Sequence, residues 1–385
     1  MLNRKIPLSW LQLTREKPRL LVALAGIAFA DILMFMQLGF QSALYDSTTR
    51  MHQNFRADLV LINPQARNLM NMQTFPRRRL YQAMSVTGVK SADALYINFT
   101  DWKNPQTRRK TAILVMGFDP QKSVFNLPEV NQHLDAIKVP DTLLFDQASR
   151  GDYQQAIVQI NQGKSVTTEL SDRQINLVGL FSVGASFGAD GSLITSDLNF
   201  LRLFPRRNAE GISIGLITLQ PGADLNQTQA ALQATLPHDV RVLTKQELIN
   251  YEKEYWQKNT AIGFIFSLGT MMGFIVGVII VYQILYTDVA DHIAEYATLK
   301  AMGYKNLYLL GIVFQEALIL SILGFIPGIG LSTGLYALTR NATNLPLFMA
   351  SLRAMQVLIL TIIMCVISGA IAMRKLQSAD PADIF

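Results

Sequence analysis

Residues 20–45 read LLVALAGIAFADILMFMQLGFQSALY, an apolar run in which Asp31 is the only charged residue. A helix needs roughly 20 apolar residues to cross a hydrocarbon core of about 30 Å, because each residue rises about 1.5 Å. The run is therefore long enough to span a membrane. Its basic flank and the triplet Ala28-Phe29-Ala30 also resemble a cleavable secretory signal, but the apolar residues continue to Phe40. That length favours an uncut anchor.

Three more runs meet the same length criterion, at 261–286, 307–339 and 355–373. The second of these contains Pro327, where a helix can bend. Short flanks set the orientation, because long domains cross a membrane largely regardless of their charge. Five basic residues precede the first run: Arg4, Lys5, Arg15, Lys17 and Arg19. The sequence thus predicts cytoplasmic segments at 1–19 (amphipathic), 287–306 and 374–385, an outer domain at 46–260 and an outer loop at 340–354.

The composition agrees with a membrane protein, since half of the residues are hydrophobic and 16% are charged. The net charge of +6 does not indicate binding to nucleic acid. Of the 34 Lys and Arg, 23 lie in residues 46–260, where 20 Asp and Glu nearly balance them. The single cysteine, Cys365, excludes an intrachain disulfide and a metal site built from several thiols.

The sequence predicts no catalytic, cofactor or metal site. The four histidines are scattered, and neither a zinc motif nor a nucleophile with an adjacent base appears. Gly163-Lys164-Ser165 resembles part of a phosphate loop, but Val158 occupies the position of the leading glycine. We therefore expect neither enzymatic activity nor ATP binding from this chain.

Residues 46–260 have the pattern of a mixed domain. Strands are predicted at 57–62, 111–116, 174–183 and 212–219, and helices at 227–236 and 245–258. The predicted fold class is an α-helical membrane protein with four transmembrane helices, one before and three after an α+β extracytoplasmic domain on helical stalks.

Two Phe-Pro-Arg segments stand out in this domain. The basic residues are Arg77, Arg78 and Arg79 in the first, and Arg206 and Arg207 in the second. Guanidinium groups beside an aromatic ring suit a carboxylate-rich partner or anionic lipid. The alternative is a pair of solvated surface loops.

Small and acidic residues interrupt the apolar runs. Glycines recur at four-residue spacing, which allows close helix approach either within the subunit or at a dimer seam: Gly269, Gly273, Gly277, Gly324, Gly328, Gly330 and Gly334. Asp31 and Glu316 are costly in lipid. They are either coupling or proton-linked residues, or acids hydrogen-bonded between helices.

Residues 288–303 read DVADHIAEYATLKAMG and predict a short amphipathic helix, with acids at its start and Gly303 at its end. It either lies on the membrane surface or forms a handle for a cytoplasmic partner. Residues 295–303, together with Phe314-Gln315-Glu316-Ala317, resemble the coupling-helix and third-span signature of MacB-type ABC permeases. Asp380-Pro381 is similar to that family's ending. Residues 7–17 and 30–37 resemble the DevC branch.

The resemblance implies a bacterial inner-membrane permease of the type VII, or mechanotransmission, class, with both termini cytoplasmic. It implies a homodimer, a separate ATPase that binds ATP and Mg²⁺, a periplasmic membrane-fusion adaptor and a TolC-like outer-membrane channel. The DevC branch is associated with glycolipid export. Contacts to the ATPase fall on Asp291, Glu295, Tyr296, Leu299, Lys300, Met302 and Gly303. Ala297 departs from the glycine common in MacB relatives. The alternative is an FtsX-like transducer that activates a periplasmic partner.

Overall fold

The computed structural model describes residue 15 and residues 17–378. The predicted amphipathic segment, apart from its last residues, and the Asp380-Pro381 ending therefore lie outside the described residues. The chain divides into two units. The helical bundle comprises Ala261–Arg340 and the described parts of 1–42 and 347–385, and the α+β domain comprises Ala43–Thr260 and Asn341–Pro346. Segment 341–346, which the sequence places in a connecting loop, thus groups with the α+β domain.

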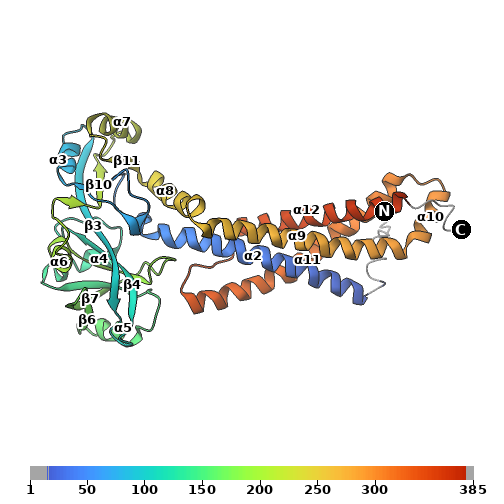
Figure 1. The fold of residues 1–385 in the computed structure, drawn as a ribbon, viewed down its shortest axis with the longest axis horizontal. Coiled ribbons are helices and arrows are strands. Elements are labelled where there is room, and N and C mark those ends of the chain that lie inside the picture. Colours follow the sequence, from blue (N-terminus) through green and yellow to red (C-terminus); the bar gives the residue numbers. More distant parts are fainter. Residues whose placement is uncertain (1–14, 16, 379–385) are drawn as a thin grey trace, which may run out of the picture. The chain divides into compact units, whose positions relative to one another are not determined.

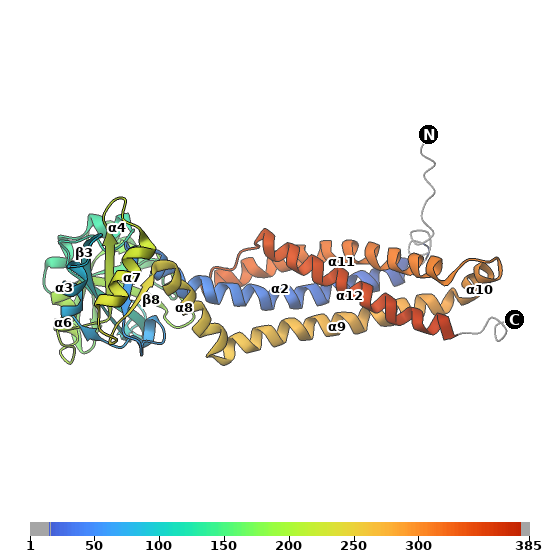
Figure 2. The ribbon, with the colours of Figure 1, turned by 90° about the horizontal axis from the view of Figure 1, so that it is seen from above.

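Long helices of the bundle run side by side, as the two views in Figures 1 and 2 show. They are α2 (Lys17–Gln53), α9 (Ala261–Asp291), α11 (Asn306–Thr343) and α12 (Ser351–Ser378), with the short α10 (Ile293–Ala301) between α9 and α11. In residues 17–378, four helices are long and apolar enough to cross a membrane, which confirms the predicted number of spans.

The bundle has apolar side chains both inside and outside. Ile27, Ala30 and Leu320 belong to its buried core, whereas Phe264 and Leu331 lie exposed on its surface. Apolar residues all round a helix are typical of a membrane span, because its outer face contacts lipid.

A large sheet forms the centre of the α+β domain (Figure 1). Its strands are β1 (Leu59–Ile62), β3 (Val89–Lys103), β4 (Lys110–Phe118), β5 (Thr142–Asp146), β6 (Val166–Leu170), β7 (Arg173–Phe181), β8 (Gly191–Ser196), β10 (Ile214–Leu219) and β11 (Arg241–Thr244). The order is β11-β1-β10-β3-β4-β8-β5-β7-β6, and β6 also pairs with β3. The strands from β3 to β6 in this order therefore close into a ring. Neighbours are antiparallel except β4–β8 and β5–β7, which are parallel.

Both faces of the sheet are covered, because successive side chains of a strand point to opposite faces. Leu59 and Leu61 of β1 join one core, and Val60 and Ile62 join the other. The first core is covered by α3 (Arg78–Met84), α5 (Gln154–Asn161), α6 (Asp197–Leu203) and α7 (Leu225–Thr235). The second is covered by α4 (Pro128–Gln132), α8 (Lys245–Lys258), η1 (Leu69–Asn71) and η2 (Ala136–Lys138). This arrangement confirms the predicted α+β class.

The short strands β2 (Phe75–Pro76) and β9 (Gly211–Ile212) pair with each other outside the large sheet. The backbone amide of Arg77 donates to Glu210, at 2.7 Å, next to this pair. The first Phe-Pro-Arg segment therefore lies against the chain that follows the second one.

Candidate functional site

Helix α10 is the centre of the predicted coupling region. The sequence predicts a helix from Asp288, but this start is wrong, because α9 continues to Asp291 and α10 begins at Ile293. The buried residues Leu285 and Val289 extend the packed face of α9 across this stretch. The break falls at His292, and Gly303 ends α10 with a φ of 91° that favours glycine.

The faces of α10 differ. Ile293 and Leu299 pack against the buried cluster of Val289, Ile312, Val313 and Met373, whereas Glu295 and Met302 are exposed. Lys300 lies in the last turn and Glu295 in the first, which complements the helix dipole. The side chain of Tyr296 lies outside the described residues. An exposed face with mixed chemistry thus lies on a helix whose other face is anchored in the bundle.

A cluster of charged residues ties the start of α2 to the end of α9. The Arg19 guanidinium lies 2.7 Å from Asp291 and 3.9 Å from Asp288. The His292 imidazole lies 3.8 Å from the same Asp288 carboxylate. Glu316 of α11 is buried near Asp288, and neither of its carboxylate oxygens has a hydrogen-bond partner among the described residues. The ion pairs therefore tie α2 to the end of α9, next to the N-cap of α10.

Sequence reasoning treated Arg19 only as part of the basic flank and did not connect it with Asp291. One signal was available. Arg19 directly precedes the first apolar run and Asp288 closely follows the second, so both were predicted at the same membrane surface.

Asp31, the other intramembrane acid, is buried between helices. It accepts a hydrogen bond of 2.5 Å from Thr361 of α12. A Cβ atom at Gly328 of α11 would lie 2.8 Å from the Cβ of Asp31. Asp31 therefore faces the bundle interior, as expected of a carboxyl group in a span.

The glycines of the spans separate into two sets. A Cβ atom at any of Gly269, Gly273 and Gly277 of α9, or of Gly324 and Gly328 of α11, would crowd α2. At Gly277 it would also crowd Met364 of α12. Around Gly330 and Gly334, the described part of the chain has no atom within 4 Å of such a Cβ. Five of the seven predicted packing glycines thus hold the bundle together around α2.

The five arginines of the Phe-Pro-Arg segments also differ. Arg79 is buried and forms a bidentate ion pair with Asp239. Its Nε and Nη2 donate to the two carboxylate oxygens at 2.9 and 2.7 Å. Arg207 donates to the Ile97 carbonyl and to Ser213. Arg77 donates to the Tyr96 hydroxyl at 3.4 Å. The structure leaves Arg78 and Arg206 exposed, so these two guanidinium groups are the best placed for a partner or lipid.

Parts of this chain are similar to known proteins. Residues 265–381 match the family model described as FtsX-like permease C-terminal. No curated protein matches the chain at a significant level. The solved structures that resemble it include the periplasmic region of MacB from Actinobacillus actinomycetemcomitans, with 9% identity over 51% of this chain and 92% of that one, at a TM-score of 0.35. Another is the extracellular domain of the noncanonic ABC-type transporter YknZ from Gram-positive bacteria, with 11% identity over 49% of this chain and 99% of that one, at a TM-score of 0.31. The family match supports a membrane-inserted subunit of the ABC permease type.

Proposed function

We propose that this chain is the permease subunit of a MacB-type, DevC-like exporter, and that it transmits the motion of a separate ATPase to the α+β domain. The observation that carries the proposal is the two-faced helix α10. Ile293 and Leu299 anchor it in the bundle, while Glu295 and Met302 are exposed. Because α10 is anchored in this way and lies between α9 and α11 in the chain, a force applied to its exposed face is transmitted to both helices.

The proposed assembly follows from the resemblance described above. The subunit sits in a bacterial inner membrane with both termini in the cytoplasm and works as a homodimer. Its ATPase holds ATP and Mg²⁺, and a membrane-fusion adaptor and a TolC-like channel complete the export path. The substrate class is lipid-like, such as a glycolipid.

A second candidate function is a transducer that exports nothing and activates a periplasmic partner. The match of residues 265–381 to an FtsX-like permease model favours keeping it. Both functions need the same motion of the membrane unit, so the fold alone does not separate them.

The coupling proposal is tested by Met302→Asp in the full permease purified with its ATPase. We expect about a tenfold loss of ATPase co-purification, because an acid replaces an exposed apolar contact at an interface. Val139→Asp is the matched control, since Val139 is an apolar residue of the α+β domain whose exposed fraction, 54%, is close to the 63% of Met302. Equal ATPase recovery with both variants would contradict a coupling role for α10.

Export and signalling are then separated by comparing lipid extracts from cells with and without the subunit. Export predicts a change in the outer-membrane lipid profile and co-purification of a membrane-fusion adaptor. An unchanged profile together with a bound periplasmic hydrolase supports the transducer instead.

A further inference from the structure

Segment 341–346 joins α11 to α12, yet it packs as part of the α+β domain. Helix α11 ends at Thr343, and Asn344 follows with a φ of 55°. Asparagine tolerates this left-handed conformation at helix ends better than most residues do. Leu345 is then buried. The end of the third span is therefore built into the α+β domain.

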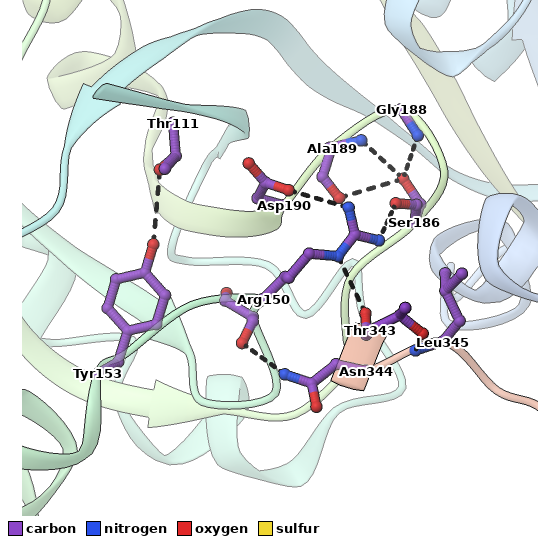
Figure 3. Close-up of polar contacts among 11 residues, drawn as sticks. Thr111, Arg150, Tyr153, Ser186, Gly188, Ala189, Asp190, Thr343, Asn344 and Leu345 are labelled. Atoms are coloured by element: carbon purple, nitrogen blue, oxygen red, sulfur yellow. Dashed lines mark hydrogen bonds and ion pairs between the residues drawn. The ribbon is translucent and has the colours of Figure 1, made fainter. Parts of the chain in front are cut away.

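Arg150 holds this end in place (Figure 3). Its Nε donates to the Thr343 carbonyl at 2.9 Å. Its two other nitrogens donate to the Asp190 carboxylate at 3.1 Å and to the Ser186 carbonyl at 3.0 Å. Next to it, the Asn344 side-chain amide donates to the Ser149 carbonyl at 3.4 Å.

The chemistry of the contact suits a helix end. The last carbonyls of an α-helix have no partner within the helix and carry a partial negative charge. A guanidinium group supplies both a donor and a positive charge there. Its planar fork also reaches Asp190 and Ser186, whose turn is closed by hydrogen bonds from Gly188 and Ala189 to the Ser186 hydroxyl. Arg150 thus links the end of α11 to a turn that is closed by its own hydrogen bonds.

The covalent joins between the two units differ in secondary structure. Within residues 17–378 the chain passes between the units at 42/43, 260/261, 340/341 and 346/347. The first and third joins lie inside the continuous helices α2 and α11, the second falls where α9 begins, and the fourth lies outside helices. The backbone of α2 and of α11 is therefore helical on both sides of its join. Only a helix that is held at its end can pull on the domain.

We propose that Arg150 is a positioning residue that makes α11 a second rod, so that movement of the membrane unit reaches the α+β domain through α11 as well as α2. This inference rests on the proposed function for the source of the movement. The anchoring itself rests only on the contacts of Arg150.

The anchor is tested by hydrogen exchange on the full permease with its ATPase in nanodiscs. Arg150→Gln should raise amide exchange in residues 341–346 by about tenfold, because the helix-end contact is lost. Arg173→Gln is the matched control, since Arg173 pairs with Asp141 in the same domain at 2.9 Å. Asn344→Gly, which suits the left-handed backbone, should loosen the segment in the same direction but less. Unchanged exchange in Arg150→Gln would overturn the inference.

The transmission is tested by the ATP-dependent change in exchange of the α+β domain. It should appear in the wild type and in Arg173→Gln, and fall at least about threefold in Arg150→Gln. In Arg150→Gln that also carries Cys365→Ala, a short thiol cross-linker between Ser149→Cys and Asn344→Cys should restore it. A full ATP response in a loosened Arg150→Gln overturns the second rod. No ATP response in the wild type overturns the proposed function and transmission together, while exchange at 341–346 still decides the anchor.

Discussion

The α+β domain and the helical bundle both bury carboxyl groups, but they surround them differently. Asp146 in the domain accepts hydrogen bonds from the amides of Ala148, Val183 and Gly184 and from the Ser192 hydroxyl, at 2.8 to 3.1 Å. Asp31 in the bundle accepts a hydrogen bond from Thr361, and its second carboxylate oxygen has no hydrogen-bond partner among the described residues.

The difference has a backbone cause. Loops of the α+β domain leave amide groups free to bind a carboxylate, whereas helices in a membrane use their amides internally. Only side chains are then left to satisfy an acid. Asp146 is therefore held as a fixed cross-link by several donors, whereas Asp31 is held by a single side-chain hydroxyl among the described residues.

The largest expected effect concerns Asp146. Asp146→Ala should lower the free energy of unfolding of the domain by about 4 kcal/mol, because it leaves buried amide donors without an acceptor. Thermal unfolding of the full chain in detergent, followed by intrinsic fluorescence, measures it. The control Asp135→Ala, at a nearly fully exposed acid, should stay within about 0.5 kcal/mol. A similarly small loss for Asp146→Ala would break the comparison.

The next effect is the pH dependence from Glu252 of α8. Burial raises the pKa of Glu252 from 4.5 to about 7, despite hydrogen bonds from Trp256 and the Leu69 amide that lower it. The stabilising contribution of the protonated form is fully present below pH 4.5 and is lost as pH rises through 7. The loss amounts to about 3 kcal/mol. His52 Nε2 lies 3.5 Å from this carboxylate.

Glu252→Gln should therefore match the wild type near pH 4.5 and exceed its stability increasingly up to pH 8, as measured by denaturant unfolding at each pH. Glu247→Gln on the same helix provides a control of opposite sign. The hydrogen bond from the Thr244 amide lowers the pKa of Glu247, so that its contribution is lost as pH falls. Parallel pH profiles for the two variants would refute this assignment.

A smaller effect separates the two faces of α11 in the bundle. In lipid, helices associate through close packing rather than through apolar burial, so crowding matters more than in the domain. Gly328→Ala should cost about 2 kcal/mol in unfolding by SDS, because its Cβ would meet Asp31 at 2.8 Å. Gly330→Ala should be neutral or slightly stabilising, since alanine favours helix. An equal cost at Gly330 would show that this face is covered by another molecule.

The sequence alone predicted the features that depend on local composition. The spans followed from run length, and the end of α10 followed from Gly303, whose φ is 91°. The contacts that organise the functional regions were not predictable in this way. Arg19 and Asp291 are 272 residues apart, and Arg150 and Thr343 are 193 apart. No local pattern selects such partners, because a guanidinium group can donate to many different carboxylates and carbonyls.

The same limit applies to the sheet. Strand β3 is fifteen residues long and pairs with β10, β4 and β6, yet it was not predicted. Its burial pattern lacks clean alternation, because different parts of the strand are covered by different neighbours. Strand order likewise depends on long-range packing.

The smallest expected effect tests which arginines of the Phe-Pro-Arg segments are structural. The double substitution Arg78→Gln with Arg206→Gln should change the free energy of unfolding by less than about 0.5 kcal/mol, because both side chains are exposed. Arg79→Gln, the matched control, should cost about 2 kcal/mol, because it leaves Asp239 without its buried partner. Both are measured by thermal unfolding. If the double variant keeps its stability and loses assembly with a partner complex, these two charges serve binding. If it loses stability as Arg79→Gln does, the exposed arginines belong to the network that holds the domain, and its charges do not separate into structural and available sets.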